Sequence, residues 1–419
     1  MVKHTGEEMT MEKKDLRCRS CGSLNLETVL DLGRMPLADA LLTEDELNSP
    51  EAAYPLEAAF CTDCSLLQIT ETVPPEMLFC KKYPYYSSFS DELLRHSREN
   101  ALELIESRGL DEKSLAVEIA SNDGYLLKNF VEKDIPCLGI DPAEGPAESA
   151  EKIGVPTICA FFNAEIASQL TGIGKRADVI IANNVLAHVA DVRGFLAGVR
   201  TLLKEDGIAS IEVPYVRDLI DNCEFDTIYH EHLCYFSATS VDRLLRTNGL
   251  YLNSVKRIPI HGGSLRLYVG RKDEPDAAVK SLLEEERESG LGDISYYNEF
   301  AAKVNNVKSG LTYILSMLRE QGASIAAYGA AAKGATLINY VGLGKETIDF
   351  VVDRNIHKQG RFMPGVRIPI SGPERLLHEQ PDYVLILAWN FAEEIMAQQE
   401  EYRARGGKFI LPIPEWKIA

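Results

Sequence analysis

The segment Glu118-Ile119-Ala120-Ser121-Asn122-Asp123-Gly124 determines the architecture of the central part of this chain. The run Leu115–Ala120 is mostly apolar and predicts a buried strand that ends in a short polar turn. Gly124 allows the chain to turn directly into a helix, predicted over Tyr125–Lys133. A strand, tight turn and helix in this order place backbone amides at a helix N-terminus, where a cofactor can bind.

Strands and helices alternate on both sides of this turn. The predicted strands are Leu115–Ala120, Cys137–Asp141, Val155–Phe161, Asp178–Asn183 and Ile208–Val213. The predicted helices are Asp91–Ser107, Tyr125–Lys133, Ala147–Ile153, Ala164–Leu170, Val192–Leu203 and Ser240–Asn248. This alternation predicts an α/β fold with a parallel sheet covered by helices on both faces. Leu250–Pro259 and Leu265–Arg271 flank a Gly-rich loop and predict an antiparallel hairpin at the sheet edge.

Polar residues where these strands end form a candidate cofactor site. Asp141 closes the second strand, where a carboxylate suits a ribose diol. Gly124 is the only glycine of the first turn, which disfavours a pyrophosphate and favours S-adenosylmethionine over NAD. Asn183 ends the fourth strand, at the edge where ligands bind in open α/β sheets. The alternative is a strand–turn–helix without a ligand.

Four cysteines near the N-terminus form two pairs with metal-ligand spacing. Cys18-Arg19-Ser20-Cys21 and Cys61-Thr62-Asp63-Cys64 can each supply two thiolates to a tetrahedral zinc ion. Four thiolates leave no open position, so the expected zinc is structural. The surrounding residues 1–80 are rich in loops and can form only a small hydrophobic core, which a bound zinc ion would stabilise.

A second α/β alternation follows a helical connector over residues 275–322. Its predicted strands are Ile325–Tyr328, Ile348–Val352, Tyr383–Leu387 and Lys408–Ile413, and its helices are Ala331–Tyr340 and Ala392–Arg405. Lys333 lies near a helix start after Gly329, where it could meet a phosphate, although an exposed lysine on a packed helix fits equally well. The sequence therefore predicts three domains: 1–80, 81–274 and 275–419.

Composition narrows the possible functions. The 419 residues carry 44 basic and 63 acidic side chains, a net charge of −19. This balance argues against a general nucleic-acid binder or a protein of anionic membranes. Residues 1–16 are polar and no apolar run could span a bilayer, so we expect a cytoplasmic protein. The sequence leaves the oligomeric state open, a monomer included.

One short segment concentrates ionisable side chains between apolar neighbours. Asp226-Thr227-Ile228-Tyr229-His230-Glu231-His232 could perform acid–base chemistry, with a histidine oriented by Glu231 and assisted by Tyr229. It could instead bind a metal through His230 and His232, although no third ligand is evident. The third interpretation is a solvated loop. An isolated histidine such as His188 is more often structural.

Several motifs occur together in an order that resembles one enzyme family. They are the two CxxC pairs, Tyr83-Pro84-Tyr85, the Glu118–Gly124 turn, Phe225–His232, Phe236-Ser237-Ala238-Thr239-Ser240, His261-Gly262-Gly263 and Ala388-Trp389-Asn390. The chain resembles the S-adenosylmethionine-dependent C-methyltransferases that act on nucleotide-linked 4-keto-deoxysugars, in particular the TDP-sugar C-3′-methyltransferases. The resemblance implies a zinc-binding head, a Rossmann-like class I methyltransferase domain, and a C-terminal pseudo-Rossmann domain.

The resemblance also implies roles for individual residues. His232 matches the catalytic base, and the other catalytic matches are Tyr229, Glu231, Tyr83 and His188. The cofactor residues are expected to be Glu118, Asn122, Asp123, Gly124, Asp141 and Asn183. Lys333 and His261 are expected to bind the nucleotide-diphosphate sugar. His230 receives no role, because close relatives carry Asp there.

The expected reaction is carbon methylation through an enolate. A carbon beside a ketone can lose a proton to a positioned base, and a hydrogen-bond donor can then stabilise the enolate oxygen. The alternatives are an O- or N-methyltransferase on the same scaffold, a zinc-ribbon nucleic-acid module, and an NAD enzyme that uses the C-terminal unit.

Overall fold

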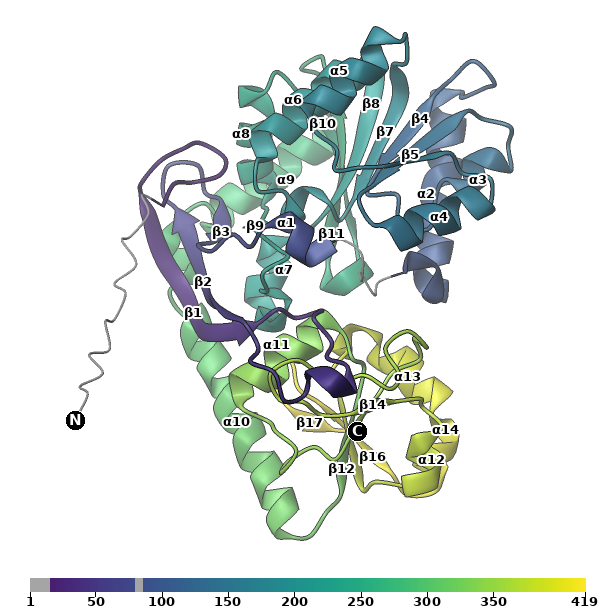
Figure 1. The fold of residues 1–419 in the computed structure, drawn as a ribbon. Helices are drawn as coiled ribbons and strands as arrows, with labels where there is room; N and C mark the ends of the chain where they lie inside the picture. Colours follow the sequence, from purple (N-terminus) through teal and green to yellow (C-terminus); the bar gives the residue numbers. More distant parts are fainter. Residues whose placement is uncertain (1–15, 80–85) are drawn as a thin grey trace, which may run out of the picture.

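The computed structural model describes residues 16–79 and 86–419, except for the side chain of His261. Three β-sheets dominate the described chain (Figure 1). A small sheet lies at the N-terminal head, a large one in the central domain and a third in the C-terminal domain. The predicted α/β fold with three parts is therefore confirmed.

The head contains an antiparallel sheet where the sequence suggested mostly loops. Its strands are β1 (Leu26–Pro36), β2 (Ala53–Cys61), β3 (Leu67–Ile69) and β9 (Cys234–Tyr235), in the order β1-β2-β3-β9. The last strand comes from the central domain: Leu67 pairs with Tyr235 and Gln68 with Cys234. The head is thus joined to the central domain by backbone pairing. The helices of this region are η1 (Glu44–Glu46) and α1 (Pro75–Phe79).

The central sheet has seven strands in the order β10-β11-β8-β7-β4-β5-β6. They are β4 (Ala116–Ile119), β5 (Cys137–Asp141), β6 (Thr157–Cys159), β7 (Ala177–Asn183), β8 (Leu203–Pro214), β10 (Tyr251–Ile258) and β11 (Ser264–Gly270). Strands β4 to β8 are parallel, and β11 is antiparallel to both of its neighbours. This arrangement confirms the parallel sheet and the edge hairpin.

Helices cover both faces of this sheet, as the alternation predicted. The helices of the region are η2 (Ser87–Phe89), α2 (Asp91–Arg108), α3 (Lys128–Val131), α4 (Glu144–Lys152), α5 (Ala164–Gly172), η3 (Leu186–His188), α6 (Val192–Leu202), α7 (Val216–Asp221), η4 (Phe225–Thr227), α8 (Ala238–Thr247) and η5 (Ile260–Gly262). Residues of α2, α3 and α4 pack with Ala116 and Val179, whereas those of α5 and α6 pack with Val117 and Ile180. Because successive strand residues face opposite ways, these are the two faces. The helix predicted over Tyr125–Lys133 is shorter, reduced to α3.

The C-terminal sheet has the order β14-β13-β12-β15-β16-β17 and is parallel except for β17. The strands are β12 (Ile325–Tyr328), β13 (Val351–Val352), β14 (Ile370–Ser371), β15 (Tyr383–Ile386), β16 (Lys408–Leu411) and β17 (Lys417–Ile418). The helices are α11 (Ala332–Val341), α12 (Arg375–Glu379), η7 (Trp389–Phe391), α13 (Ala392–Gln398) and α14 (Glu400–Ala404), preceded by the connector helices α9 (Ala277–Ser289), η6 (Ile294–Tyr297) and α10 (Phe300–Glu320). The helix predicted over Ala392–Arg405 is divided in two.

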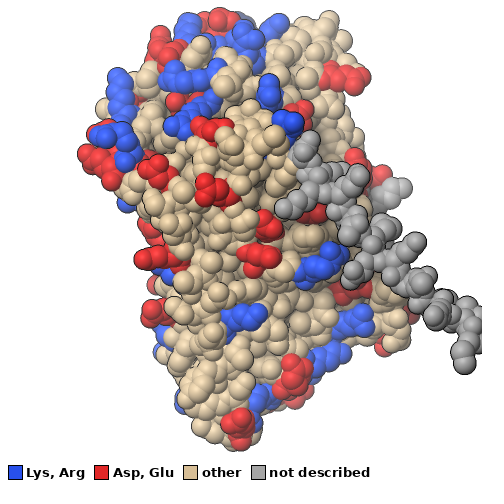
Figure 2. All heavy atoms as spheres, turned by 90° about the vertical axis from the view of Figure 1, so that its left-hand side faces the viewer, with Lys and Arg blue, Asp and Glu red and all other residues tan. Residues whose placement is uncertain are grey.

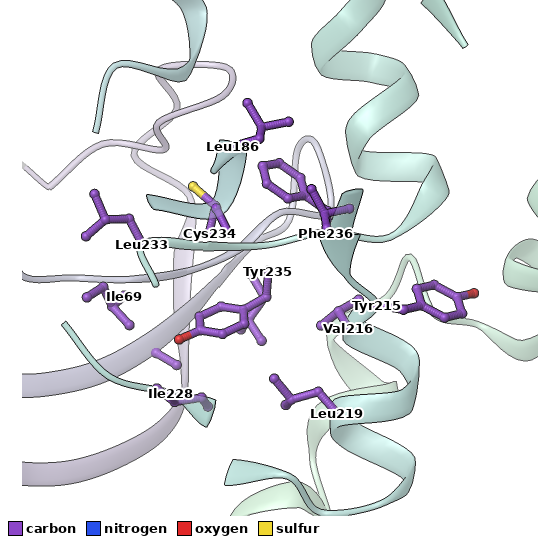
Figure 3. Packing of buried hydrophobic residues seen from close by; sticks show 14 of the residues in the cluster. Ile69, Leu186, Tyr215, Val216, Leu219, Ile228, Leu233, Cys234, Tyr235 and Phe236 are labelled. Atoms are coloured by element: carbon purple, nitrogen blue, oxygen red, sulfur yellow. The ribbon is translucent and has the colours of Figure 1, made fainter. Parts of the chain in front are cut away.

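The three parts share one apolar core. It includes Leu30 of β1, Leu311 of α10 and Ile338 of α11, all within the same cluster of buried side chains. The head also contacts the C-terminal domain through Glu51, which accepts hydrogen bonds from Gly365 N at 2.9 Å. At the other end of the head, the side chains around β9 pack against Ile69 and Leu219 (Figure 3).

The face of the molecule formed by the head and α10 carries both positive and negative side chains. On this face, acidic and basic side chains are interspersed among uncharged ones wherever described residues are visible (Figure 2). Among the helices of the described chain, none is long and apolar enough to cross a membrane.

The shared strand pairing makes a prediction about stability. Leu67 in β3 is fully buried, so Leu67→Ala should lower the free energy of unfolding by about 2–5 kcal/mol. Because β3 pairs with β9, head and central domain should unfold in one transition, measured by urea denaturation with circular dichroism. Leu24→Ala is the control, since Leu24 is 55% exposed and its loss should change stability by less than about 0.5 kcal/mol. A separate early transition of the head in wild-type protein would contradict this cooperativity.

Candidate active site

The turn after β4 adopts a conformation that few residues tolerate. Ala120, Asn122 and Gly124 have φ angles of 57°, 49° and 77°, all in the left-handed region. Asp141, at the end of β5, holds this turn: its carboxylate accepts hydrogen bonds from Asn122 N and Ala143 N, each at 2.8 Å. The turn is therefore fixed to the carboxyl edge of the sheet, where the sequence placed a cofactor.

Two predicted cofactor residues also hold the segment before α2. Ser87 N donates to Asn122 Oδ1 at 2.9 Å, and Ser88 N donates to Asp123 Oδ2 at 3.2 Å. These bonds place η2 beside the turn after β4. The side-chain oxygen of Asn122 and one carboxylate oxygen of Asp123 thus accept hydrogen bonds from the protein backbone. The other oxygen, Asp123 Oδ1, remains available to a ligand.

Buried acceptor atoms without partners gather at this edge. They are Glu118 Oε1 and Oε2, Asp123 Oδ1, Asn183 Oδ1 and Asn184 Oδ1. Buried polar atoms in folded proteins are normally hydrogen-bonded, so this group indicates a missing donor. A ligand with an ammonium group would donate hydrogen bonds to them, and the positive charge of a sulfonium would attract the carboxylates. The residues present therefore fit S-adenosylmethionine.

Two buried glutamates at this edge differ in charge environment. Burial, together with the charges of Asp141, Asp123 and Glu212, raises the pKa of Glu118 well above its usual range. Burial would also raise the pKa of Glu212, but hydrogen bonds from His96 at 3.0 Å and Arg266 at 2.7 Å keep it below its usual value. Glu118 has no such cation among the described residues, and a positively charged ligand would supply one.

The segment Tyr229–His232 forms a cluster with His188, as the sequence suggested. His232 Nε2 lies 3.0 Å from Tyr229 Oη, and its ring centroid is 4.7 Å from that of His188. His232 Nδ1 lies 2.9 Å from the carbonyl oxygen of Thr227. Since a carbonyl only accepts, this contact places the proton on Nδ1 and makes Nε2 the basic nitrogen.

Thr227 takes the orienting role that the sequence suggested for Glu231. The Glu231 side chain is buried, and burial and the charge of Asp39 of the head raise its pKa well above the usual range, although the charge of Lys358 opposes the rise. The sequence could not indicate the Thr227 contact, because a backbone carbonyl is available at every residue.

His188 and His230 lie in different surroundings. His188 packs edge-on against Phe79, with ring centroids 5.6 Å apart, and burial lowers its pKa to about 4. Its imidazole is therefore neutral at physiological pH. His230 points to the head instead, where its Nε2 lies 3.1 Å from the Pro55 carbonyl oxygen. The hypothesis of a metal held by His230 and His232 receives no support from this arrangement.

Leu233 fixes the end of this cluster by its backbone. Its N–H donates to the Ala187 carbonyl at 2.7 Å, and its carbonyl accepts from Ile69 N at 3.1 Å. The first bond ties the loop to η3, which carries His188. The second ties it to β3 of the head.

Lys333 lies in a half-buried polar cluster between the central and C-terminal domains. Its Nζ donates to Asn390 Oδ1 at 2.8 Å and lies 4.7 Å from the centroid of the Trp389 ring. Trp389 Nε1 donates to Asp226 Oδ2 at 2.7 Å, and burial raises the pKa of Asp226 to about 6. Lys333 would have to leave Asn390 to meet a diphosphate.

A pocket of about 620 Å³ opens beside this cluster, between the two domains. Trp389, Asn390, Glu224 and Arg257 are among its lining residues, together with Gly262 and Gly263. His261 lies in η5 at the same rim, but its side chain is outside the described residues. Tyr83, which was predicted to be catalytic, also lies outside the described residues.

The four predicted metal ligands converge. The sulfur atoms of Cys18, Cys21, Cys61 and Cys64 all lie within 4.8 Å of one another. The Cys18–Cys64 and Cys21–Cys61 sulfur pairs are 3.4 Å and 3.6 Å apart. A tetrahedral zinc ion with Zn–S bonds of about 2.3 Å needs sulfur–sulfur edges of about 3.8 Å, so the cluster fits zinc.

Removing one ligand should release this metal. Cys64→Ser should reduce bound zinc from one equivalent to near zero and lower the melting temperature, measured by metal analysis and calorimetry. Cys159→Ser is the matched control, because Cys159 is exposed and outside the cluster. Full zinc content in the Cys64 variant would contradict the assignment.

Comparison with known proteins agrees with this architecture. Family models match residues 18–79 as a "zinc binding domain", 89–255 as a "Methyltransferase domain" and 259–414 as a "C-methyltransferase C-terminal domain". The C-methyltransferase NovU of Streptomyces niveus is 36% identical over 404 residues, 96% of each chain.

More distant relatives match a smaller share of the chain. A ubiquinone biosynthesis O-methyltransferase of Azorhizobium caulinodans is 31% identical over 122 residues, 28% of this chain and 46% of that protein. The crystal structure of magnesium protoporphyrin IX methyltransferase from Synechocystis is 13% identical, with 43% of this chain and 79% of that chain covered and a TM-score of 0.34. The nearly full-length similarity to NovU, with matching models along the chain, shows that this protein belongs to the S-adenosylmethionine-dependent C-methyltransferases.

Proposed function

We propose that this enzyme methylates C-3′ of a nucleotide-linked 4-keto-deoxysugar. The observation that carries the proposal is the His232 cluster, in which the basic Nε2 faces Tyr229 and His188 in the loop that follows η4. A general base with adjacent hydrogen-bond donors suits removal of a proton beside a ketone. The interdomain pocket supports a substrate that contacts both domains.

The cofactor would be held at the carboxyl edge of the central sheet. Glu118, Asp123 Oδ1 and Asn183 provide acceptors for its cationic groups, and Asp141 would share its carboxylate between the turn and the ribose. Asn122 and Gly124 shape the turn. The bound cofactor supplies an electrophilic methyl carbon on a positively charged sulfur.

The protein side chains then perform the proton chemistry. His232 Nε2 removes the C-3′ proton, and the electron pair of that C–H bond moves toward the C-4′ oxygen. Tyr229 and neutral His188 can donate hydrogen bonds to this enolate oxygen, a role we also assign to Tyr83. As C-3′ forms its bond to the methyl carbon, the bond between that carbon and sulfur would break and leave its electron pair on sulfur as a neutral thioether. His232 then returns its proton to solvent.

The substrate contacts are proposed for two residues at the interdomain rim. His261 lies in η5 beside Gly262 and Gly263 of the pocket. Lys333 would exchange Asn390 for a phosphate oxygen when the substrate enters. This exchange would bring positive charge to a diphosphate in a protein of net charge −19.

The base assignment is tested with a deuterated substrate. His232→Ala should reduce turnover by about 10²–10⁴-fold, because the general base is lost, while affinity for S-adenosylmethionine stays within about twofold. Mass spectrometry should show that wild-type product has gained a methyl group and lost the C-3′ deuterium. His378→Ala is the control on an exposed histidine. A methylated product that retains deuterium would instead indicate O- or N-methylation.

Cofactor binding should release a proton from the acidic edge. Burial and the nearby acids raise the pKa of Glu118, which favours its protonated form in the ligand-free protein, whereas a bound cation would favour loss of that proton. Affinity for S-adenosylmethionine should therefore rise with pH, and calorimetry in buffers of different ionisation enthalpy should detect the proton. Glu118→Gln should reduce this release, while the titration of the cofactor's own amine is the same in both proteins. Equal release in both would contradict the role of Glu118.

A further inference from the structure

Arg257 lies near the end of β10, where the central domain borders the interdomain pocket of about 620 Å³. It is the only lysine or arginine among the described residues that line this pocket. The C-terminal domain contributes Trp389 and Asn390 to the same lining. Since Lys333 donates a hydrogen bond to Asn390, each of the two domains brings one cation to the pocket.

Two contacts hold the Arg257 guanidinium in place. Its Nη2 donates to Asp218 Oδ1 at 2.7 Å, and its Cζ lies 5.1 Å from the centroid of the Tyr215 ring. Both partners belong to one short segment, because Tyr215 directly precedes α7 and Asp218 lies within it. A guanidinium carries five N–H donors in a planar fork, and the bond to Asp218 uses one of them. Arg257 can therefore bind a second acceptor without breaking this bond.

The chemistry of these groups favours a diphosphate as that acceptor. The planar fork of an arginine matches two oxygen atoms of a phosphate, whereas a lysine acts as a point charge. The diphosphate of a nucleotide sugar carries one negative charge on each phosphate. Arg257 and Lys333 together match both charges, whereas either cation alone would leave one charge without a partner.

The pocket also contains two carboxyl groups, which would repel a diphosphate if both carried a free charge. The charge of Asp218 is already paired with Arg257. Glu224 accepts a hydrogen bond from Asn222 Nδ2 at 3.2 Å, and burial raises the pKa of Glu224 to about 7. A large share of the Glu224 side chains is therefore uncharged near neutral pH. The pocket can thus accept an anion in a protein of net charge −19.

We propose that Arg257 binds the diphosphate of the substrate from the central domain, while Lys333 binds the same diphosphate from the C-terminal domain. The inference rests on the proposed function for the identity of the sugar, but binding of the diphosphate can be measured without methyl transfer. Because each domain supplies one cation, the bound diphosphate orients the attached sugar with respect to both domains.

The test measures the binding of nucleoside diphosphates by titration calorimetry. Thymidine, uridine, guanosine and adenosine diphosphates are the probes, and no methyl acceptor is present. Arg257→Met should weaken binding of the tightest of these probes by about tenfold or more, because a charge-assisted contact to phosphate is lost. The remaining affinity should also depend less on salt concentration. The melting temperature and zinc content should be unchanged, since Arg257 is exposed over 49% of its side chain.

Lys256→Met is the matched control. Lys256 is the neighbouring residue in β10, its side chain is 47% exposed, and it has equivalent partners in the Glu103 carboxylate and the Tyr268 ring. It is not among the described residues that line the pocket. Diphosphate affinity of Lys256→Met should therefore stay within about twofold of the wild-type value.

Three results would overturn the inference. They are equal diphosphate affinity in wild type and Arg257→Met, an equal loss of affinity in Lys256→Met, and no binding of any of the four probes to wild-type protein. A different result would affect only the proposed reaction. If a diphosphate binds through Arg257 but no nucleotide-linked 4-keto-sugar is methylated, the diphosphate site stands and the proposed function fails.

Discussion

One residue, Leu233, joins three segments that are distant in sequence. Its N–H bonds to Ala187 beside His188, and its carbonyl bonds to Ile69 in the head. Cys234 and Tyr235 then continue as the fourth strand of the head sheet. Only Leu233 separates His232 from this strand. The position of the proposed base His232 therefore depends on a β-sheet that belongs mostly to another part of the chain.

The electrostatics of the site follow from where its carboxylates are neutralised. Glu212 is paired with Arg266 and His96, whereas Glu118 has no cation among the described residues. In this protein of net charge −19, some buried carboxyl groups therefore have a cationic partner and others do not. Glu118, a buried acid without a protein counter-charge among the described residues, lies where a cationic cofactor fits, so the acidic composition that argues against polynucleotides suits this ligand.

The extent of successful prediction differs between local and long-range features. The turn at Gly124 and the four cysteines could be predicted because their signals lie within short segments of fixed chemistry. The head sheet could not be predicted, because its edge strand β9 consists of Cys234 and Tyr235, which lie far along the chain from the other strands. The same limit applies to the site. Side-chain types identified the His232 loop, but the partner of His232 is the backbone carbonyl of Thr227, which no side-chain pattern can reveal.

The zinc cluster gains a function from this arrangement beyond stabilising a small domain. Cys61 ends β2, and Cys64 lies in the turn that leads to β3, where Ser65 has a φ of 63°. A metal bound there constrains the turn between the two strands. Since β3 pairs with β9, any loosening of that turn would be transmitted through two residue pairs to the loop that carries His232. The predicted metal site and the proposed base His232 are thus connected through a single short strand, so a metal that takes no part in the chemistry would still support the loop that carries His232.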